Sequence, residues 1–198
     1  MPNNKSRKLF DRISRHYGRF YNRQRKNYSR IFKEMDECNL SYFSSILDIG
    51  CGSGAMASVF AEIGLKTYAV DQSMGMLRVA KSRRENGDVD FFQVSGEDGL
   101  TFCDNSIDIV IAAHVAHGMK ADLRMKLYGE MKRVAKHLVI LHDYNQARSL
   151  PTTVVEFAEG GDYFNFIKVV KEELRDYFGN LEVVNTENRS CCYVCHIG

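Results

Sequence analysis

Three glycines at alternate positions follow directly after a short apolar run, and this feature constrains the fold most. The run covers residues 45–49, and the glycines are Gly50, Gly52 and Gly54. A helix-forming segment starts at residue 55. Glycine has no Cβ, so a turn built in this way lets the backbone approach a ligand closely at a helix N-terminus. The pattern predicts a buried strand, a tight turn and a helix that together bind a ligand.

A second strand-like run follows this helix and ends in an acidic residue. It covers residues 66–71, and Asp71 lies seventeen residues after Gly54. In nucleotide-binding βαβ units an acid at this place accepts hydrogen bonds from the hydroxyls of a ribose. The glycine turn and Asp71 together predict a cofactor that contains adenosine.

Two classes of adenosine cofactor fit the pattern. The string Gly50-x-Gly52-x-x-Ala55 satisfies the loose dinucleotide fingerprint, which predicts an NAD-dependent oxidoreductase. Asp48, two residues before the first glycine, favours S-adenosylmethionine (SAM). A carboxylate there can meet the ammonium of an amino-acid cofactor, whereas a pyrophosphate would gain nothing from it. The glycines also come after a basic, helix-forming segment, and dinucleotide domains more often begin at their fingerprint strand.

The chain resembles the class I SAM-dependent methyltransferases, in particular the branch that acts on small molecules such as quinone precursors. The likeness is dense from residue 45 to residue 145. Successive family motifs match residues 47–54, 70–77, 95–110 and 130–136. This resemblance implies a Rossmann-like α/β fold, with a seven-stranded, mostly parallel sheet, an antiparallel last strand, helices on both faces and an N-terminal helical segment. The alternation of predicted strands and helices points the same way.

The resemblance also implies which residues bind SAM, whose product is S-adenosylhomocysteine (SAH). Asp48 and the three glycines of the turn are expected to hold the methionine part, Asp71 the ribose, and Glu97 or Asp98 the adenine. Gly96 occupies the position where the family often has the adenine-binding acid, so the choice between Glu97 and Asp98 stays open. The remaining residues of the expected cofactor-binding set are Tyr17, Cys51, Gln72, Met76, Gly96 and His114.

The length of 198 residues predicts a single domain covering residues 1–198. Residues 41–198 are expected to form the SAM-binding core and residues 1–40 a basic helical segment. The composition is ordinary for a globular protein, with 44% hydrophobic and 26% charged residues. No apolar run is long enough to span a membrane, and the N-terminus lacks a secretory core. We therefore expect a cytoplasmic protein, either a monomer or a homodimer.

The N-terminal segment is strongly basic. Residues 1–36 contain eleven Lys or Arg and three Asp or Glu, a net charge of +8, which leaves −6 for the rest of the chain. Apolar residues recur on one helical face, including Phe10, Tyr17 and Ile31. The segment is interpreted as a helix docked on the domain, as a lid over the cofactor, or as a surface for nucleic acid or an anionic membrane. The string from Phe10 to Tyr17 resembles a segment that folds over the cofactor in the family.

Six cysteines invite a metal or redox interpretation, and Cys192-Tyr193-Val194-Cys195-His196 matches the attachment pattern of c-type haem. This string lies in the last strand-like segment of a chain without a secretory signal. We expect buried, reduced thiols on a terminal strand and no bound metal.

Residues after the fourth and fifth predicted strands are the candidates for chemistry, because ligands of α/β sheets collect at the carboxyl ends of strands. His114 and His117 follow the strand over 107–113 and are the catalytic candidates, either as bases for an acceptor or as pocket lining. The candidate substrate-binding residues are His117, His142, Glu159, Tyr163 and Phe164.

The rarity of proline narrows the acceptor. Pro2 and Pro151 are the only prolines, so the Asp/Asn-Pro-Pro-aromatic tetrapeptide of amino-directed base methylases is absent, as is a Pro-Cys nucleophile. We therefore expect methyl transfer from SAM to a small-molecule acceptor. The alternatives are an RNA- or protein-directed methyltransferase that uses the basic segment, and a SAM-binding protein without catalysis.

Overall fold

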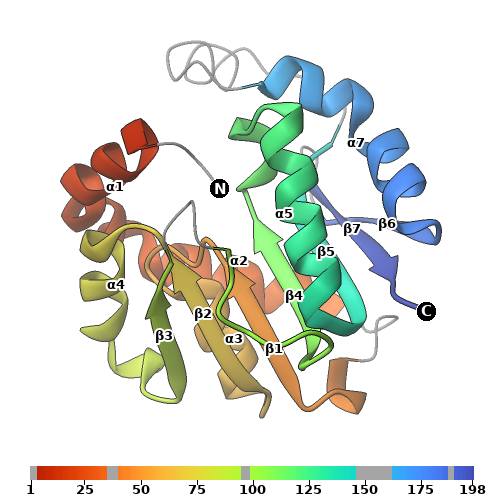
Figure 1. Ribbon diagram of the computed structural model, residues 1–198. Coiled ribbons are helices and arrows are strands. Elements are labelled where there is room, and N and C mark those ends of the chain that lie inside the picture. The colour runs from red at the N-terminus through yellow and green to blue at the C-terminus, as the bar shows by residue number, and fades with distance from the viewer. Residues whose placement is uncertain (1–3, 35–39, 95–98, 146–161, 187–189) are drawn as a thin grey trace.

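The computed structural model describes residues 4–34, 40–94, 99–145, 162–186 and 190–198 (Figure 1). Seven strands of this described part form one mixed sheet in the order β3-β2-β1-β4-β5-β7-β6. β7 runs antiparallel to both of its neighbours, β5 and β6, and the other pairings are parallel. The fold class predicted from the sequence is confirmed. The strands are β1 (Ser45–Ile49), β2 (Lys66–Asp71), β3 (Val89–Gln93), β4 (Ile107–Ala113), β5 (Ala135–Tyr144), β6 (Leu181–Asn185) and β7 (Ser190–His196).

Helices cover both faces of the sheet. The α-helices of the described part are α1 (Asn4–Tyr17), α2 (Tyr21–Glu34), α3 (Ala55–Glu62), α4 (Met74–Lys81), α5 (Ala121–Val134) and α7 (Tyr163–Phe178). Short 3₁₀ turns are η1 (Gly18–Phe20), η3 (Leu40–Tyr42), η4 (Arg84–Asn86) and η5 (Ala116–Gly118). Because the central strands are buried on both faces, their sequences are continuous apolar runs and do not alternate between apolar and polar residues.

Two apolar layers form most of the core. On one face, α2 and α3 pack on β1, β4 and β5, and α4 extends this layer over β2 and β3. On the other face, α5 and α7 cover β4, β5 and β7. Alternate residues of β5 serve the two layers, with Ile140 facing α2 and α3, and Val139 and Leu141 facing α5 and α7.

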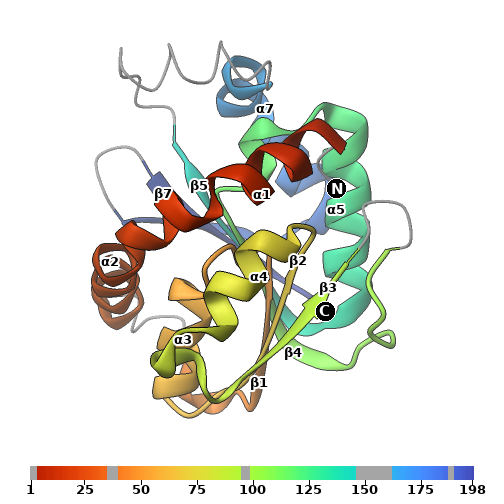
Figure 2. The ribbon, with the colours of Figure 1, turned by 90° about the vertical axis from the view of Figure 1, so that its left-hand side faces the viewer.

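The two N-terminal helices pack on the glycine-turn half of the domain. Figure 2 shows α1 passing over α4, while α2 lies beside α3. Asp11 in α1 accepts hydrogen bonds at Oδ1 from the Ser73 hydroxyl (2.6 Å) and the Gly75 backbone N–H (2.9 Å). Ser73 is also the N-cap of α4, since its oxygen accepts from the Met76 N–H. The start of α4 and the middle of α1 are therefore fixed to each other.

The apolar face of the basic segment is only partly covered. Tyr21, Ile31 and Phe32 are buried, and the Tyr21 hydroxyl donates to Asn86 Oδ1 at 2.7 Å. Phe20, which belongs to the same predicted stripe, is exposed. It lies in η1, where the helical register changes between α1 and α2, so its side chain does not continue the face of either helix.

The carboxyl ends of the parallel strands meet at one edge of the sheet. In Figure 1 the arrow of β4 points upward between α1 on the left and α7 on the right. The glycine turn follows β1 at this edge, Asp71 ends β2, and His114 follows β4. The fold thus brings the predicted site residues of the described segments to one end of the sheet, as expected for an open α/β sheet.

Candidate cofactor and acceptor site

The three glycines of the turn all have positive φ, at 73° for Gly50, 53° for Gly52 and 79° for Gly54. A Cβ on Gly50 would lie 2.6 Å from Val115 Cγ2, and one on Gly54 would lie 2.5 Å from Asn86 Nδ2. Side chains of the protein therefore fill the space beside Gly50 and Gly54. A Cβ on Gly52 would meet Tyr17 Cε1 first, at 3.9 Å, so the space beside Gly52 remains open toward α1.

Asp71 holds the glycine turn to the end of β2. Its Oδ2 accepts from the Gly52 N–H at 2.8 Å, and its Oδ1 accepts from the Ser73 N–H at 2.7 Å. Burial raises the pKa of Asp71, and these two backbone donors partly offset the rise. Each oxygen can accept a further hydrogen bond, so the carboxylate can fix the turn and still receive ribose hydroxyls.

Asp48 is buried under the turn without a hydrogen-bond partner for either carboxylate oxygen among the described residues. Burial, followed by the neighbouring carboxylate of Asp71, raises the pKa of Asp48 to about 8. The Ala57 backbone N–H is near enough to offset part of this rise but makes no hydrogen bond to it. A buried carboxyl without a partner is costly, and a cation would satisfy it. The predicted contact of Asp48 with the ammonium of SAM stays a prediction.

The other predicted cofactor residues of the described segments surround this turn. Burial and the carboxylates of Asp71 and Asp48 raise the pKa of the Cys51 thiol well above its ordinary value, so the thiol is neutral. Gln72 is half-buried and its carbonyl accepts from Gln93 Nε2. The Met76 side chain is buried in the first turn of α4. These positions stay predictions for cofactor contact.

The candidate acceptor side consists of two histidines and an aspartate. His117 in η5 approaches Asp143 in β5, with Nδ1 of the imidazole 2.8 Å from Oδ1 of the carboxylate. His114 Nδ1 lies 3.9 Å from the same oxygen, and His114 has a positive φ of 53° that is held by its N–H donating to the His142 carbonyl. The ligand atoms of His114, His117 and Asp143 all lie within 4.8 Å of one another.

Asp143 is fully buried and receives N–H donors on both oxygens. Oδ1 accepts from Tyr144 N at 2.8 Å, and Oδ2 lies 3.1 Å from Ala116 N and 3.3 Å from His117 N. Burial alone would raise the pKa of Asp143, but the His117 imidazole, followed by His114 and the Tyr144 N–H, lowers it to about 2. The carboxylate is therefore ionised. From the sequence, Asp143 is a residue at the end of the fifth strand that could bind substrate or a metal. Its contact with His117 could not be predicted, because that contact requires the pairing of β4 with β5.

His142 points to the opposite face of β5 from Asp143. It is buried beside Tyr28, with ring centroids 5.8 Å apart, and its Nε2 lies 3.3 Å from the Thr186 hydroxyl. Burial lowers the pKa of His142 to about 3, so this ring is neutral. Its predicted role in substrate binding is untested, and its present surroundings leave it 1% exposed.

Two aromatic candidates begin α7. Tyr163 is buried with its ring centroid 5.1 Å from that of Tyr144 and 6.4 Å from that of His117. Phe164 is exposed beside it. Tyr163 therefore belongs to the wall behind the His117 imidazole, whereas Phe164 lies at its rim. Four further predicted residues lie outside the described part of the chain: Gly96, Glu97, Asp98 and Glu159.

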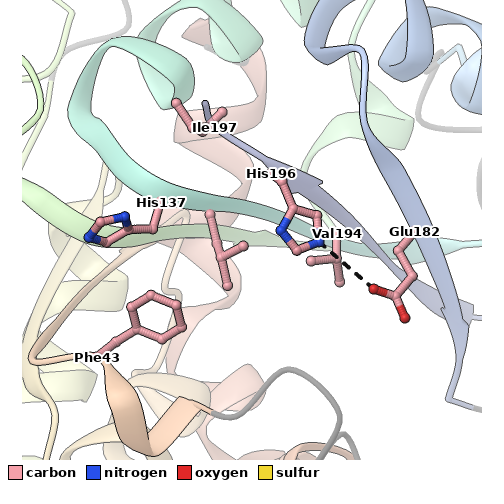
Figure 3. Close-up of a pocket in the computed structure, with 7 residues that line it drawn as sticks. Phe43, His137, Glu182, Val194, His196 and Ile197 are labelled. Carbon is pink, nitrogen blue, oxygen red and sulfur yellow. Dashed lines mark ion pairs between the residues drawn. The ribbon is translucent and has the colours of Figure 1, made fainter.

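The pocket in Figure 3 lies at the other end of the sheet, near the amino end of β5. Phe43 and His137 form one wall, with ring centroids 5.6 Å apart. His196 Nε2 lies 3.8 Å from Glu182 Oε2 on another wall. This pocket is separate from the glycine turn, and the site residues predicted from the sequence do not line it.

The cysteines of β7 lie inside the sheet. Cys191, Cys192 and Cys195 are buried, and burial raises the pKa of Cys195 to about 12. Their place in the central part of the core is that of small apolar residues. The residues that match the haem-attachment pattern therefore belong to a strand whose cysteines pack in the core.

A family model described as a methyltransferase domain matches residues 47–141, from β1 to β5. Over this span, which is just under half of its length, the chain is similar to the class I SAM-dependent methyltransferases. The matched span contains the glycine turn, Asp71, both histidines after β4 and most of β5.

Two curated methyltransferases resemble this part of the chain. A demethylmenaquinone methyltransferase of Renibacterium salmoninarum is 38% identical over 93 residues, which are 46% of this chain and 36% of that protein. A second demethylmenaquinone methyltransferase, of Paenarthrobacter aurescens, is 33% identical over 115 residues, 57% of this chain and 42% of that protein. The matches thus span less than half of each relative.

Solved structures share the fold at low sequence identity. The magnesium protoporphyrin IX methyltransferase of Synechocystis, solved with SAH bound, has a TM-score of 0.60 and is 17% identical, with 100% of this chain and 89% of that chain covered. At this identity the likeness concerns the fold. None of the helices in the described segments has the length and apolarity to cross a membrane.

Proposed function

We propose that the protein transfers a methyl group from SAM to a small-molecule acceptor. The observation that carries this proposal is Asp48, a buried carboxyl that lacks a hydrogen-bond partner among the described residues and lies directly below the glycine turn. SAM supplies an electrophilic methyl group on a sulfonium sulfur. The chain contributes alignment of that group with an acceptor, which is the main part of catalysis for an in-line displacement.

The residues of the turn divide the binding of SAM between them. Asp48 binds the ammonium of SAM, and the methionine part lies in the open space beside Gly52. Asp71 accepts hydrogen bonds from the ribose hydroxyls while it also holds the glycine turn. Glu97 or Asp98 binds the adenine. Because the turn is already fixed by Asp71, little of the backbone has to be ordered when the cofactor binds.

A small-molecule acceptor is supported by two independent observations. The two curated relatives above are named as demethylmenaquinone methyltransferases. The candidate acceptor side of this chain is lined by the rings of His114, His117, Tyr144 and Tyr163. Such a wall suits a flat, partly apolar molecule.

The basic N-terminal segment serves as a lid in this proposal. Tyr17 ends α1 opposite Gly52, and its hydroxyl accepts from Gln24 Nε2 at 3.1 Å. Residues 1–40 would thus cover the methionine side of the cofactor, and residues 41–198 would form the core that binds it. The buried positions of Cys191 and Cys195 suit thiols that stay reduced, as in the cytoplasm.

Calorimetric titration of the full chain with SAM, SAH and NAD tests the cofactor assignment. We expect micromolar binding of SAM and SAH and none of NAD. Asp48→Asn, which keeps the shape of the side chain and removes its charge, should weaken SAM binding by about tenfold or more because it leaves the ammonium without a counter-charge. Asp122→Asn, an exposed change in α5, is the matched control. Binding of NAD alone would overturn the proposal.

Methylation of RNA is a second candidate, favoured by the exposed basic side chains of α1, η1 and α2. These are Arg7, Lys8, Arg12, Arg19, Arg23, Lys26, Arg30 and Lys33. RNA binding through such a surface weakens steeply with salt. Filter binding of an RNA oligonucleotide between low and moderate salt decides between the candidates. Binding that is lost when Arg19, Arg23 and Lys26 are replaced by Gln would favour RNA.

A further inference from the structure

We propose that Asp143 positions His117 as the base that takes a proton from a hydroxyl group of the acceptor. This inference rests on the proposed function and deepens it, because it assigns the acceptor to hydroxylated aromatic compounds. Asp143 is a positioning residue in this scheme, and His117 is the catalytic one.

The hydrogen bonds of Asp143 fix which nitrogen of His117 faces the acceptor. Oδ1 of the carboxylate lies 2.8 Å from Nδ1 of the imidazole. A carboxylate only accepts hydrogen bonds, so Nδ1 carries the proton and Nε2 is left with the lone pair that a base needs. The same carboxylate stabilises the imidazolium that forms when Nε2 is protonated.

Three backbone donors hold the carboxylate itself in place. Ala116 N and His117 N donate to Oδ2, and Tyr144 N donates to Oδ1. Two of these donors belong to η5, the turn that carries His117. The aspartate on β5 therefore fixes the backbone and the imidazole of one short segment together, which leaves His117 little freedom to rotate.

The segment that carries His117 also touches the glycine turn. Val115, two residues earlier, packs so closely on Gly50 that a Cβ there would lie 2.6 Å from it. β1 and β4 are paired directly, with Ile49 opposite Ala112. The His117 imidazole is thus anchored to the same strand ends that hold the methionine part of the cofactor, which is the place that an attacking acceptor must reach.

The surroundings of His117 suit an aromatic acceptor. Its ring centroid lies 4.8 Å from that of Tyr144 and 6.5 Å from that of Phe166. A flat ring can pack edge-to-face against such side chains. A hydroxyl on that ring is a weak nucleophile until a base takes its proton.

The proposed step balances without a further reactant. A lone pair of the acceptor oxygen forms the new bond to the methyl carbon, while the carbon–sulfur bond breaks and its electron pair stays on sulfur. The hydroxyl proton moves to Nε2 of His117. The products are the methyl ether, SAH and an imidazolium that is bonded through Nδ1–H to Asp143.

The same three residues, His114, His117 and Asp143, have the chemistry of a divalent-cation site. The four N–H donors around the Asp143 oxygens favour the base instead, because a metal ligand would have to give up part of this set. Metal content of protein purified without chelators tests this rival. One equivalent of zinc, iron or manganese that is lost in Asp143→Asn would overturn the proposal.

The tautomer of His117 is the decisive readout, and it does not depend on turnover. Long-range ¹H–¹⁵N spectra of histidine-labelled protein, assigned with His117→Gln, should show the Nδ1–H form in the wild type and its loss in Asp143→Asn. His196→Gln, an exposed change at the far end of β7, is the control. An Nε2–H tautomer of His117 in the wild type would overturn the inference even where SAM binds as expected.

Kinetic measurements then distinguish a role of Asp143 in positioning His117 from a role in folding alone. SAH release is measured with hydroquinone, catechol and other hydroxylated aromatic probes. His117→Gln leaves Asp143 its backbone donors and should lower kcat by on the order of 10²-fold or more with little change in KM. Asp143→Asn should lower kcat in the same way. Turnover unaffected by His117→Gln, or an absence of turnover with every hydroxylated probe, would overturn the proposal.

Discussion

The backbone N–H of Gly52 donates to Oδ2 of Asp71 across 2.8 Å, so the middle of the glycine turn is tied to the end of the neighbouring strand. The two residues are nineteen positions apart in the sequence. The bond keeps the open side of Gly52 facing Tyr17, and no other atom of the described residues would lie within 4 Å of a Cβ there. Stability of the turn and access of the cofactor thus depend on the same contact.

Gly52→Ala should fold and yet bind SAM poorly. The added Cβ would not clash with neighbouring atoms, but the positive φ of 53° costs about 1–2 kcal/mol for an L-residue. The new methyl group would also occupy the open side of the turn. Gly64→Ala is the matched control, because Gly64 also has a positive φ and open surroundings but lies in the turn before β2. Thermal unfolding should show similar losses, and calorimetry a loss of SAM affinity in Gly52→Ala alone. Equal affinity in the two variants would contradict the assignment.

Asp71→Asn should weaken SAM binding and also destabilise the protein without SAM. An amide can accept at one end only, so either the Gly52 N–H or the Ser73 N–H is left without its buried acceptor, at about 1–3 kcal/mol. Urea unfolding measures the loss of stability, and calorimetry measures the affinity. If stability falls while SAM affinity stays at the wild-type value, Asp71 acts on the turn and does not meet the ribose.

SAM affinity should rise with pH through the range in which Asp48 loses its proton. Without the cofactor the pKa of Asp48 is about 8, and an ammonium beside it favours the ionised form, so binding releases a proton at neutral pH. We expect affinity to increase by about tenfold per pH unit up to pH ~8 and then to level off. Calorimetry in two buffers of different ionisation enthalpy counts the proton. Asp48→Asn should abolish the release.

The same pKa has a consequence for folding. The unfolded carboxyl ionises near its ordinary value of 3.8, whereas the folded one keeps its proton until about pH 8. Asp48 therefore favours the folded state below pH ~4 and progressively disfavours it as the pH rises to ~8. Asp48→Asn should accordingly be more stable than the wild type at pH 8, a gain opposite in sign to its loss of SAM affinity.

Much of the fold follows from local sequence signals. The bounds of β2 and β4 agree with those read from their apolar runs, and Ser73 caps α4 as its position before an apolar segment predicts. β5 begins at Ala135 because α5 ends at Val134 and runs into the strand without an intervening loop. No sequence signal marks such a direct junction, since a glycine or proline is what usually identifies a helix end.

The site is less accessible to sequence reasoning because its contacts are long-range. The motif identifies Asp48 and Asp71, but the bond from Gly52 to Asp71 and the missing partner of Asp48 depend on the packing of β1 against β2. Asp143 and His117 are twenty-six positions apart, and only the parallel pairing of β4 with β5 brings them together. The alternation of β5 could have placed Asp143 on the face of α5 and α7, although not its hydrogen bonds.

Asp11→Ala should loosen α1 from the domain. The change removes the acceptor for the Ser73 hydroxyl and the Gly75 N–H, worth about 1 kcal/mol each. These two bonds lower the pKa of Asp11, so their contribution is present above the unfolded value of 3.8 and is lost as the pH falls through the folded pKa. Trypsin should cleave α1 about tenfold faster in the variant, and His16→Gln, an exposed change in the same helix, should leave the rate unchanged. Unchanged cleavage of Asp11→Ala would show that packing alone holds α1.

Arg124 is fully buried in α5 and joins three other segments near His117. Its guanidinium donates to Glu173 through Nε (2.9 Å) and Nη2 (2.6 Å), and to Asp162 and the Met119 carbonyl through Nη1. Arg124→Met should destabilise the protein by about 3–5 kcal/mol, because it leaves two carboxylates near the core without their cation. Lys126→Met, exposed on the same helix, should change stability by less than about 0.5 kcal/mol. Urea unfolding measures both, and similar values for the two variants would show that α7 is held by its apolar face rather than by Arg124.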